Sequence, residues 1–172
     1  MEKNGITLSR YAWKGHTAVC VAGGVSLTQK QVDLCKDYKV IAINDAYKLT
    51  PNADILYACD SQWWGWHNGV PEFKGYKLTH QQDAVKLQTY PNIDYILSDG
   101  KSGFSYKQDR IRHGSNSGYQ ALHIALSMGA DRVLLLGYDM HANTGKSHWF
   151  GEHPTGKQRD SRYAEWIKEF SA

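Results

Sequence analysis

Short apolar runs, bounded by polar or glycine-containing turns, recur along the chain. Runs of this kind are typical of strands that are buried on both faces of a parallel sheet. The predicted strands cover residues 17–23, 39–43, 54–59, 92–97 and 132–136, and residues 75–79 are predicted to form an edge strand.

Three segments have a helical pattern. Thr28 is a favourable N-cap for a helix that ends near Tyr38, a second helix is predicted from Ser117 to Met128, and a third covers residues 159–170. The second helix has one apolar stripe spaced for contact with a sheet, which consists of Leu122, Ala125, Leu126 and Gly129. Strands that alternate with helices imply parallel pairing and right-handed crossovers. We therefore predict a single α/β domain over residues 1–172, with a three-layer, Rossmann-like fold around a mostly parallel central sheet.

Polar residues follow four of the predicted strands. They are Ser26, Asn44, Asp45, Asp60, Ser61, Tyr138 and Asp139. The carboxyl ends of parallel strands lie at one edge of the sheet, where open α/β folds bind their ligands. One polar strand end is a turn, whereas four that share an edge predict a pocket. Long loops are often functional, and those predicted here cover residues 61–74, 98–115 and 138–158.

The composition is that of an ordinary soluble protein, with 41% hydrophobic and 22% charged residues. The net charge of +3 is small and the Lys and Arg residues are scattered, so no basic stripe supports nucleic acid as a partner. Cys20, Cys35 and Cys59 are odd in number and lack zinc-site spacing, which predicts reduced thiols. No signal core and no run of ~20 apolar residues is present, so we expect a soluble, cytoplasmic protein without a membrane span.

Aromatic residues are frequent and many lie outside the predicted strands. The chain has six Trp and eleven Tyr, with clusters at residues 63–67 and 148–150. Aromatic side chains with a polar group are common in pockets for flat rings. A run of tryptophans is nevertheless more often packing than a ligand site.

The segment Gly23-Gly24-Val25-Ser26 joins the first strand to the first helix. Glycines let the backbone approach a ligand closely, and N–H groups at a helix start favour phosphate. The segment matches neither the GxGxxG fingerprint nor a Walker A loop. A tight strand-to-helix turn explains it equally well.

Asn44 and Asp60 end the second and third strands. An Asn side chain can bond to a base or ribose edge, and an Asp can accept from ribose hydroxyls or hold a metal. Each is also a common turn or cap residue. The segment 115–118, Ser-Asn-Ser-Gly, offers hydroxyls and helix-start N–H groups that suit phosphate, carboxylate or ribose. We favour a ligand role for it because plain capping needs only one such residue.

Histidines are concentrated in the last long loop. His148 or His153 could act as a general base, because imidazole titrates at about pH 6.5. With His141 and Asp139 they could also bind a metal, although the spacing matches no zinc signature. Exposed histidines without a catalytic role are the alternative.

The order of these motifs resembles the small bacterial sialyltransferases that modify lipo-oligosaccharide. It is also similar to the related pyrophosphokinase-like family of motility accessory factors and archaeal pterin enzymes, and most of all to short bacteriophage-encoded proteins of that superfamily. The resemblance rests on Gly-Gly-x-Ser-Leu after the first strand, Asn-Ser-Gly-Tyr before the second helix, and Gly-Tyr-Asp-Met with a His-rich loop after the last strand. It covers residues 17–153 by motif order and is most specific in residues 21–27 and 115–139.

In the sialyltransferases, CMP-sialic acid lies across the strand ends and a loop histidine acts as the base. By this resemblance the nucleotide-binding residues are Gly23, Gly24, Ser26, Asn44, Asp60, Asn116, Ser117 and Gly118. His153 falls near the base with one extra residue before it, so His148 remains a rival. Tyr138 or the helix-mouth N–H groups would stabilise the leaving phosphate.

The chain also departs from the family pattern. Gly23 and Asp60 stand where the family has Asn, and the lid segment is shorter. These changes would alter the nucleotide contacts and could admit a metal, so the identity of the donor does not transfer.

We therefore expect a nucleotide-binding domain of a transferase, foremost a sialyltransferase-like glycosyltransferase that uses a nucleotide-sugar donor and requires no cofactor. The first alternative is a Mg²⁺-dependent, pyrophosphokinase-like enzyme that transfers diphosphate, with Asp60 and Asp139 as metal ligands. The second is a non-catalytic phage nucleotide-binding protein, located in the cytoplasm of an infected bacterial host. The acceptor and assembly into a homo-oligomer are left open.

Overall fold

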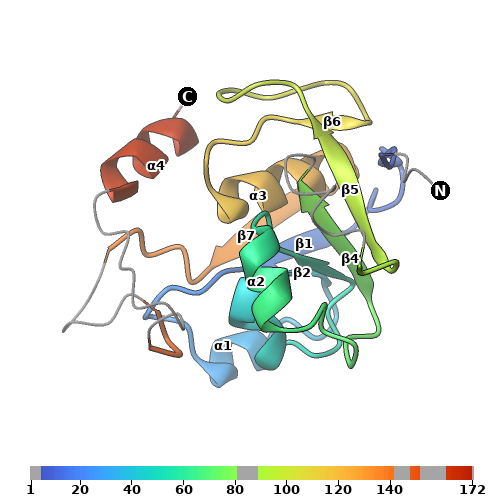
Figure 1. The fold of residues 1–172 in the computed structure, drawn as a ribbon. Coiled ribbons are helices and arrows are strands. Elements are labelled where there is room, and N and C mark those ends of the chain that lie inside the picture. Colours follow the sequence, from blue (N-terminus) through green and yellow to red (C-terminus); the bar gives the residue numbers. More distant parts are fainter. Residues whose placement is uncertain (1–4, 81–88, 142–147, 152–161, 172) are drawn as a thin grey trace.

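Strands and helices alternate along the chain (Figure 1). The computed structural model describes residues 5–80, 89–141, 148–151 and 162–171. Its elements are β1 (Thr17–Val21), α1 (Gln29–Asp33), β2 (Lys39–Ile43), the 3-10 helix η1 (Asn44–Lys48), β3 (Ile55–Tyr57), α2 (Ser61–Trp66), β4 (Tyr76–His80), β5 (Ile93–Ser98), β6 (Arg110–Ile111), α3 (Ser117–Ser127), β7 (Arg132–Leu136) and α4 (Tyr163–Phe170).

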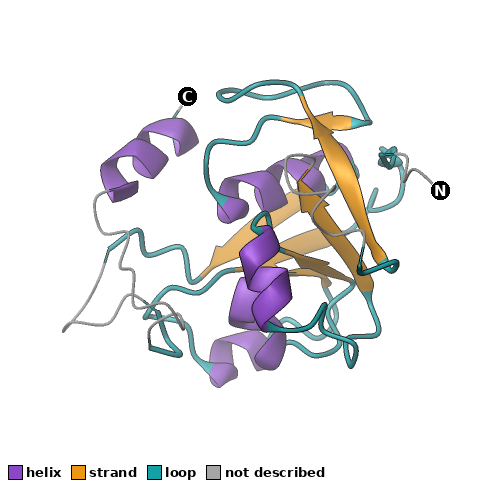
Figure 2. Cartoon of the chain, in the orientation of Figure 1, coloured by secondary structure: helices purple, strands orange, loops and turns teal. Residues whose placement is uncertain are grey.

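The strands form one sheet in the order β6-β5-β4-β3-β2-β1-β7, and every pair is parallel. The chain adds β1 to β6 in one direction and then returns through α3 to place β7 on the other side of β1. The strand order therefore reverses between β1 and β7. Figure 2 shows helices on both sides of the sheet. The predicted Rossmann-like α/β fold with a parallel central sheet is confirmed.

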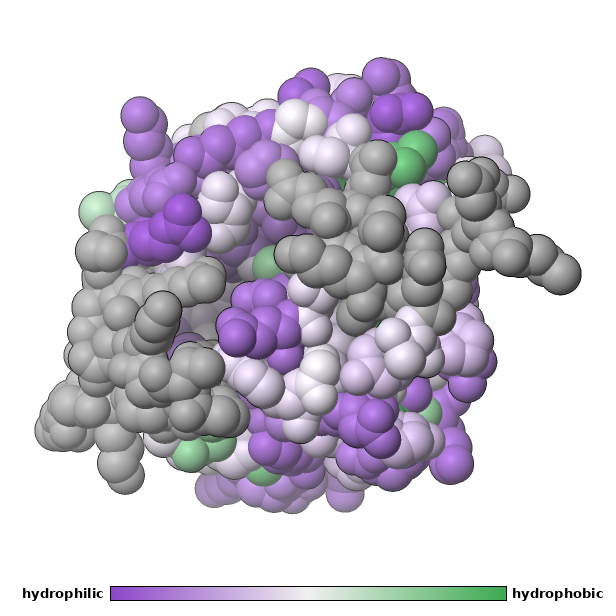
Figure 3. Space-filling view, in the orientation of Figure 1, coloured by the Kyte–Doolittle hydropathy of each residue, from purple (hydrophilic) through white to green (hydrophobic). Residues whose placement is uncertain are grey.

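The surface on the face shown in Figure 3 is mostly hydrophilic, with hydrophobic residues scattered over it. None of the helices in the described part of the chain has the length and apolar content needed to cross a bilayer.

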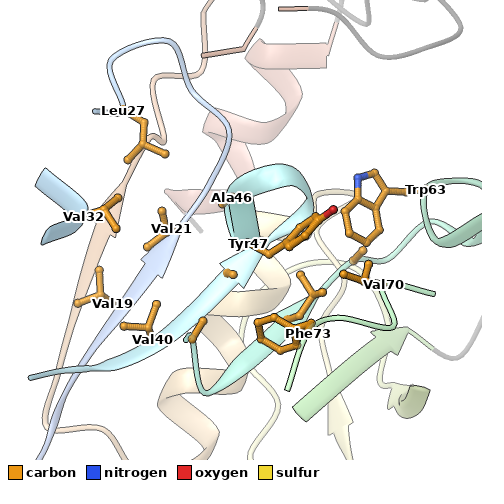
Figure 4. Close-up of a cluster of buried hydrophobic side chains, with 14 of the residues drawn as sticks. Val19, Val21, Leu27, Val32, Val40, Ala46, Tyr47, Trp63, Val70 and Phe73 are labelled. Carbon is orange, nitrogen blue, oxygen red and sulfur yellow. The ribbon is translucent and has the colours of Figure 1, made fainter. Parts of the chain in front are cut away.

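The middle of the sheet, formed by β1, β2 and β3, is buried on both faces. Successive side chains of a strand point to opposite faces, and each face of β1 contributes to a different core. Val19 and Val21 belong to the core on the side of α1 and α2, which Figure 4 shows in part. Ala18 and Cys20 belong to the core that includes Ala121, Ile124 and Ala125 of α3. Covering both faces explains why the strands read as continuous apolar runs rather than as alternating ones.

Several element boundaries differ from the prediction. α1 is much shorter than predicted. The N–H groups of Leu34 and Cys35 donate to carbonyl oxygens three residues back instead of four, and this tighter turn leads the chain toward β2. β4 is not an edge strand but lies between β3 and β5. The helix α2 and the strand β6 occupy segments predicted as loops. Asp60, which caps α2 by accepting from Gln62 N–H at 3.0 Å, was the local signal for that helix.

The predicted apolar stripe of α3 is confirmed at Ala125 and wrong at Leu126. Leu126 is 43% exposed, whereas Ala121, Ile124 and Ala125 are fully buried against the sheet. Small side chains at this face allow the helix to approach the strands closely. The polar residues Gln120 and His123 of α3 are also buried, because they bond to neighbouring loops.

Candidate functional site

A cleft of about 340 Å³ lies at the carboxyl ends of the strands. Its walls come from the segments that follow β1, β2, β3 and β7, from the segment before α3, and from α2 and α4. Figure 3 shows the surface hollowed between the regions of the molecule that carry α2, α3 and α4. The cleft includes the point between β1 and β7 where the strand order reverses, which is the usual ligand position in open α/β sheets.

The predicted pocket residues are brought together. Those that line the cleft are Gly23, Gly24, Asn44, Asp60, Asn116, Ser117, Gly118, Tyr138, Asp139, His141 and His148. Ser26 does not line it but bonds directly to Asp139. Asp45 is turned into the core. His153 lies outside the described residues, so its predicted role as base stays a prediction.

Asp139 joins the loop after β7 to the loop after β1. Its carboxylate accepts from Ser26 N–H at 2.8 Å and from the Ser26 hydroxyl. A Cβ on Gly24 would lie 2.3 Å from Asp139 Oδ2 and 2.4 Å from the carbonyl oxygen of Gly137. Glycine at position 24 is therefore required for this contact within the protein. The N–H and hydroxyl of Ser26 are bonded to a carboxylate in this structure, at a place where the sequence predicted a ligand.

His148 is held over Gly23 at the rim of the cleft. A Cβ on Gly23 would lie 3.2 Å from His148 Nδ1, and Trp149 N–H donates to the carbonyl oxygen of Gly23 at 3.1 Å. The imidazole stacks on the ring of Phe150, with a centroid distance of 4.9 Å and an interplanar angle of 6°. These contacts fix an imidazole at the cleft, as the predicted base requires.

The start of α3 is held by side chains from the cleft. Asn116 caps the helix by accepting from Tyr119 N–H at 3.0 Å. The Ser117 hydroxyl donates to Cys59 Sγ at 3.0 Å. The Tyr138 hydroxyl donates to the carbonyl oxygen of Gly118 at 3.0 Å. Within the described residues no hydrogen bond engages the N–H groups of Ser117 and Gly118. These two amides are the part of the helix mouth that can receive an anion.

Tyr138 supports the start of α3 through both its hydroxyl and its ring. Burial raises the pKa of its phenol well above the ordinary value, and the neighbouring Cys20 thiol raises the pKa further. A Cβ on Gly118 would lie 2.7 Å from Cε1 of this ring. Tyr138 therefore positions the first turn of α3, and Gly118 provides the space for it.

Backbone strain is concentrated at the cleft. Five non-glycine residues of the described chain have positive φ, and three of them line the cleft: Asn44 at 51°, Ser115 at 53° and Met140 at 52°. Such conformations are unfavourable for residues other than glycine and cluster at ligand sites, where the surrounding structure maintains them. The strain supports a functional role for this edge of the sheet.

Cationic side chains are absent from the described wall of the cleft, since its lining residues include no Lys or Arg. Asp60 and Asp139 both line it, as the metal-dependent alternative requires, but each carboxylate already bonds to the chain. The described residues contain no group of three His, Cys, Asp or Glu side chains placed to hold a metal ion. The Mg²⁺ site stays a prediction.

The sequence did not indicate all of the lining residues. Those missed come from α2, from α4 and from the strand ends, and they include Cys59, Gln62, Trp63, Trp66, Tyr163 and Trp166. Asp60 could have indicated α2 as a helix at the strand end. No local signal indicates that α4 reaches the cleft, because its position depends on contacts with distant segments.

The fold and the cleft define an open-sheet α/β protein with a ligand-sized site at the reversal of its strand order. Comparisons of the chain with models of known families, with curated proteins and with solved structures give no match. The function is therefore argued from the cleft itself.

Proposed function

We propose that the protein is a nucleotide-binding transferase, foremost a glycosyltransferase that uses a nucleotide-sugar donor bound in the cleft. The observation that carries the proposal is the meeting of the α3 mouth, the imidazole of His148 and the strained strand ends at the reversal point of the sheet. The motif order that resembles the sialyltransferases supports the same class.

The charge of the cleft favours a donor with few phosphates. A nucleoside triphosphate needs several cations, supplied as Lys, Arg or Mg²⁺, to offset its charge. The described lining residues include no Lys or Arg, and the groups there that suit an anion are the two unbonded amides of α3 and the two histidines His141 and His148. A donor with one phosphodiester fits this wall better than ATP, which ranks sugar transfer above diphosphate transfer.

Of the two described histidines that line the cleft, we assign the role of base to His148, which the contacts with Gly23 and Phe150 hold in place. In a direct displacement the acceptor hydroxyl attacks the anomeric carbon, and its proton passes to the neutral imidazole. The bond between that carbon and the phosphate oxygen breaks at the same time. The nucleotide leaves with the electron pair, and the N–H groups of Ser117 and Gly118 stabilise the phosphate.

Binding of free nucleotides gives the first test. Thermal unfolding is followed with CMP, UDP, GDP and ATP, and with CMP-, UDP- and GDP-sugars, each with and without Mg²⁺. A ligand at a hundred times its dissociation constant should stabilise the fold by roughly 2.7 kcal/mol. We expect a nucleotide or nucleotide sugar to bind without metal. Failure of the whole panel to bind would overturn the proposal, and binding of ATP only with Mg²⁺ would favour the diphosphate-transferring alternative.

Turnover separates an enzyme from a binding protein. The donor that binds is incubated with the wild type and with the variants His148→Gln and His153→Gln, and release of the nucleotide is measured. We expect His148→Gln to lower the rate by about 10²- to 10⁴-fold, the range for loss of a general base, without weakening donor binding. Donor recovered intact from the wild type would assign the cleft to a non-catalytic nucleotide-binding protein.

A further inference from the structure

Aromatic side chains from two helices bound the cleft. Trp63 and Trp66 come from α2, and Tyr163 and Trp166 come from α4. The two helices are separated by about a hundred residues of sequence, so the fold rather than a local motif brings these rings to one cavity. Aromatic rings in a ligand cavity are suited to stacking on flat groups.

The polar edge of Trp63 is used inside the protein. Its indole N–H donates at 3.0 Å to Asp45 Oδ2, and Asp45 is only 3% exposed. Burial opposes ionisation of Asp45, but the hydrogen bonds from Lys48 and Trp63, together with the charges of Lys48 and His67, outweigh burial and lower the pKa of this carboxyl. Figure 4 shows Trp63 beside Tyr47, whose ring meets it edge to face at 6.0 Å. The indole is therefore fixed in orientation with its hydrogen-bond donor already satisfied.

Trp166 is fixed in the same way at the other helix. Its indole N–H donates to the carbonyl oxygen of Ser115 at 3.0 Å, and the ring of Tyr163 packs edge-on against it at 5.6 Å. The rest of α4 is held by the contact of Phe170 with Tyr119 at 5.3 Å. Trp166 thus offers ring surface rather than a donor to a ligand, whereas Trp63 is only 2% exposed and belongs to the buried core.

The bond to Ser115 places an aromatic ring next to the anion position. Ser115 comes two residues before Ser117, whose N–H is one of the two amides at the α3 mouth. A ligand that spans both features needs a flat ring and an anionic group separated by a short linker. The cleft volume of about 340 Å³ falls within the range of small-molecule sites.

We propose that Trp66, Tyr163 and Trp166, which are only partly buried, form an aromatic subsite that binds the base of a nucleoside monophosphate unit by stacking. This inference rests on the proposed function, since it assigns the base end of the same ligand. Stacking recognises the ring surface shared by all bases, so the subsite supplies affinity for a base more than choice between bases.

The test compares ligands that share a phosphate and differ in the base. Calorimetric titrations use CMP, UMP, AMP and GMP, with ribose 5-phosphate as the matched ligand that lacks a base. The wild type should bind the best nucleotide roughly 5- to 100-fold more tightly than ribose 5-phosphate, as expected for one base stacked on an aromatic ring. Nucleotides, but not ribose 5-phosphate, should quench tryptophan fluorescence.

Three variants assign the effect to the rings. Trp166→Leu, and independently Trp66→Leu on the other helix, should each reduce the preference for nucleotides and leave the affinity for ribose 5-phosphate unchanged. Trp166→Phe loses the bond to Ser115 but keeps a ring, and should retain most of the preference. Tyr106→Leu, at a ring that is 84% exposed and does not line the cleft, should change neither affinity.

Each contrary result has a distinct meaning. Equal wild-type affinities for ribose 5-phosphate and all four nucleotides would overturn the aromatic subsite and leave the anion site of the proposed function standing. Equal losses for both ligand types in both Leu variants would show that the rings only support the α3 mouth, which also overturns the subsite. If none of the five ligands binds the wild type, the proposed function fails and the subsite fails with it.

Discussion

His123 lies inside the protein with both ring nitrogens against backbone groups. Nδ1 accepts from Arg112 N–H at 3.3 Å, and Nε2 lies 3.3 Å from the carbonyl oxygen of Ser105. Only the neutral imidazole has an acceptor nitrogen for Arg112 N–H, because both nitrogens of the charged form are donors. Burial lowers the pKa of His123 from 6.5 to about 4, and nearby Arg112 also lowers it.

This histidine should make the fold sensitive to weak acid. Because its pKa is lower in the folded state, the unfolded chain binds the extra proton first, and stability falls as pH drops from 6.5 toward 4. Between pH 7 and pH 5 the free energy of unfolding should fall by about 2 kcal/mol from this group. Urea unfolding at several pH values measures the slope, and an NMR titration of the His123 ring measures its pKa. A His123 pKa near 6.5 would contradict the prediction.

The glycines show what single residues can and cannot reveal in a sequence. Gly23, Gly24 and Gly118 were correctly placed at the cleft, because each follows a strand or begins a helix. A missing side chain does not indicate which atom occupies the space it leaves. In the structure those atoms belong to His148, Asp139 and Tyr138. Only long-range contacts could reveal that these positions receive protein side chains.

At the scale of elements, α3 is the helix on which the site depends most. Asn116→Ala should destabilise the protein by about 1 kcal/mol, because the cap of the Tyr119 N–H is lost. The matched control is Thr28→Ala, which removes the cap of α1 outside the cleft lining and should destabilise by a similar amount. Chemical denaturation measures both effects. Nucleotide binding should weaken in Asn116→Ala alone. Equal nucleotide affinities in the two variants would show that the Asn116 cap does not contribute to the binding site.

Elements with strong local signals were predicted closely. β2 and β7 have the predicted bounds and α3 differs by one residue, because each combines a clear apolar pattern with a turn or cap residue at its start or end. β6 has two residues and depends on pairing with β5, so no pattern within it could indicate a strand. The position of α4 is set by the ion pair between Lys101 and Glu165, at 2.7 Å, and by contacts of Phe170 with aromatic residues that are distant in the sequence.

At the scale of the whole molecule, protection should decrease from the middle of the sheet to its margins. Val19, Ile41 and Leu56 of β1, β2 and β3 are 0% exposed, whereas Leu134 and Leu135 of β7 are 40% and 39% exposed. Within the described residues β7 pairs with β1 alone. Native-state hydrogen exchange should therefore show the slowest amides in β1, β2 and β3 and faster ones along β7.

The same measurement bears on assembly. If the amides of β7 are as protected as those of β1, the outer margin of β7 is covered in solution, and light scattering after size-exclusion chromatography would show whether a second copy covers it. Exposed strand margins are sites where chains pair with one another. Assembly into a homo-oligomer stays a prediction.

The placement of β7 beside β1 has a consequence for synthesis on the ribosome. β1 is translated first among the strands, and its neighbour on one side, β7, is translated last. Until then β1 presents unpaired backbone groups on that side, and Ser26 has no carboxylate to bond. A nascent chain can therefore stack the first six of the described strands in order of translation without a complete cleft, because the lining residues from Gly137 to Trp166 leave the exit tunnel later.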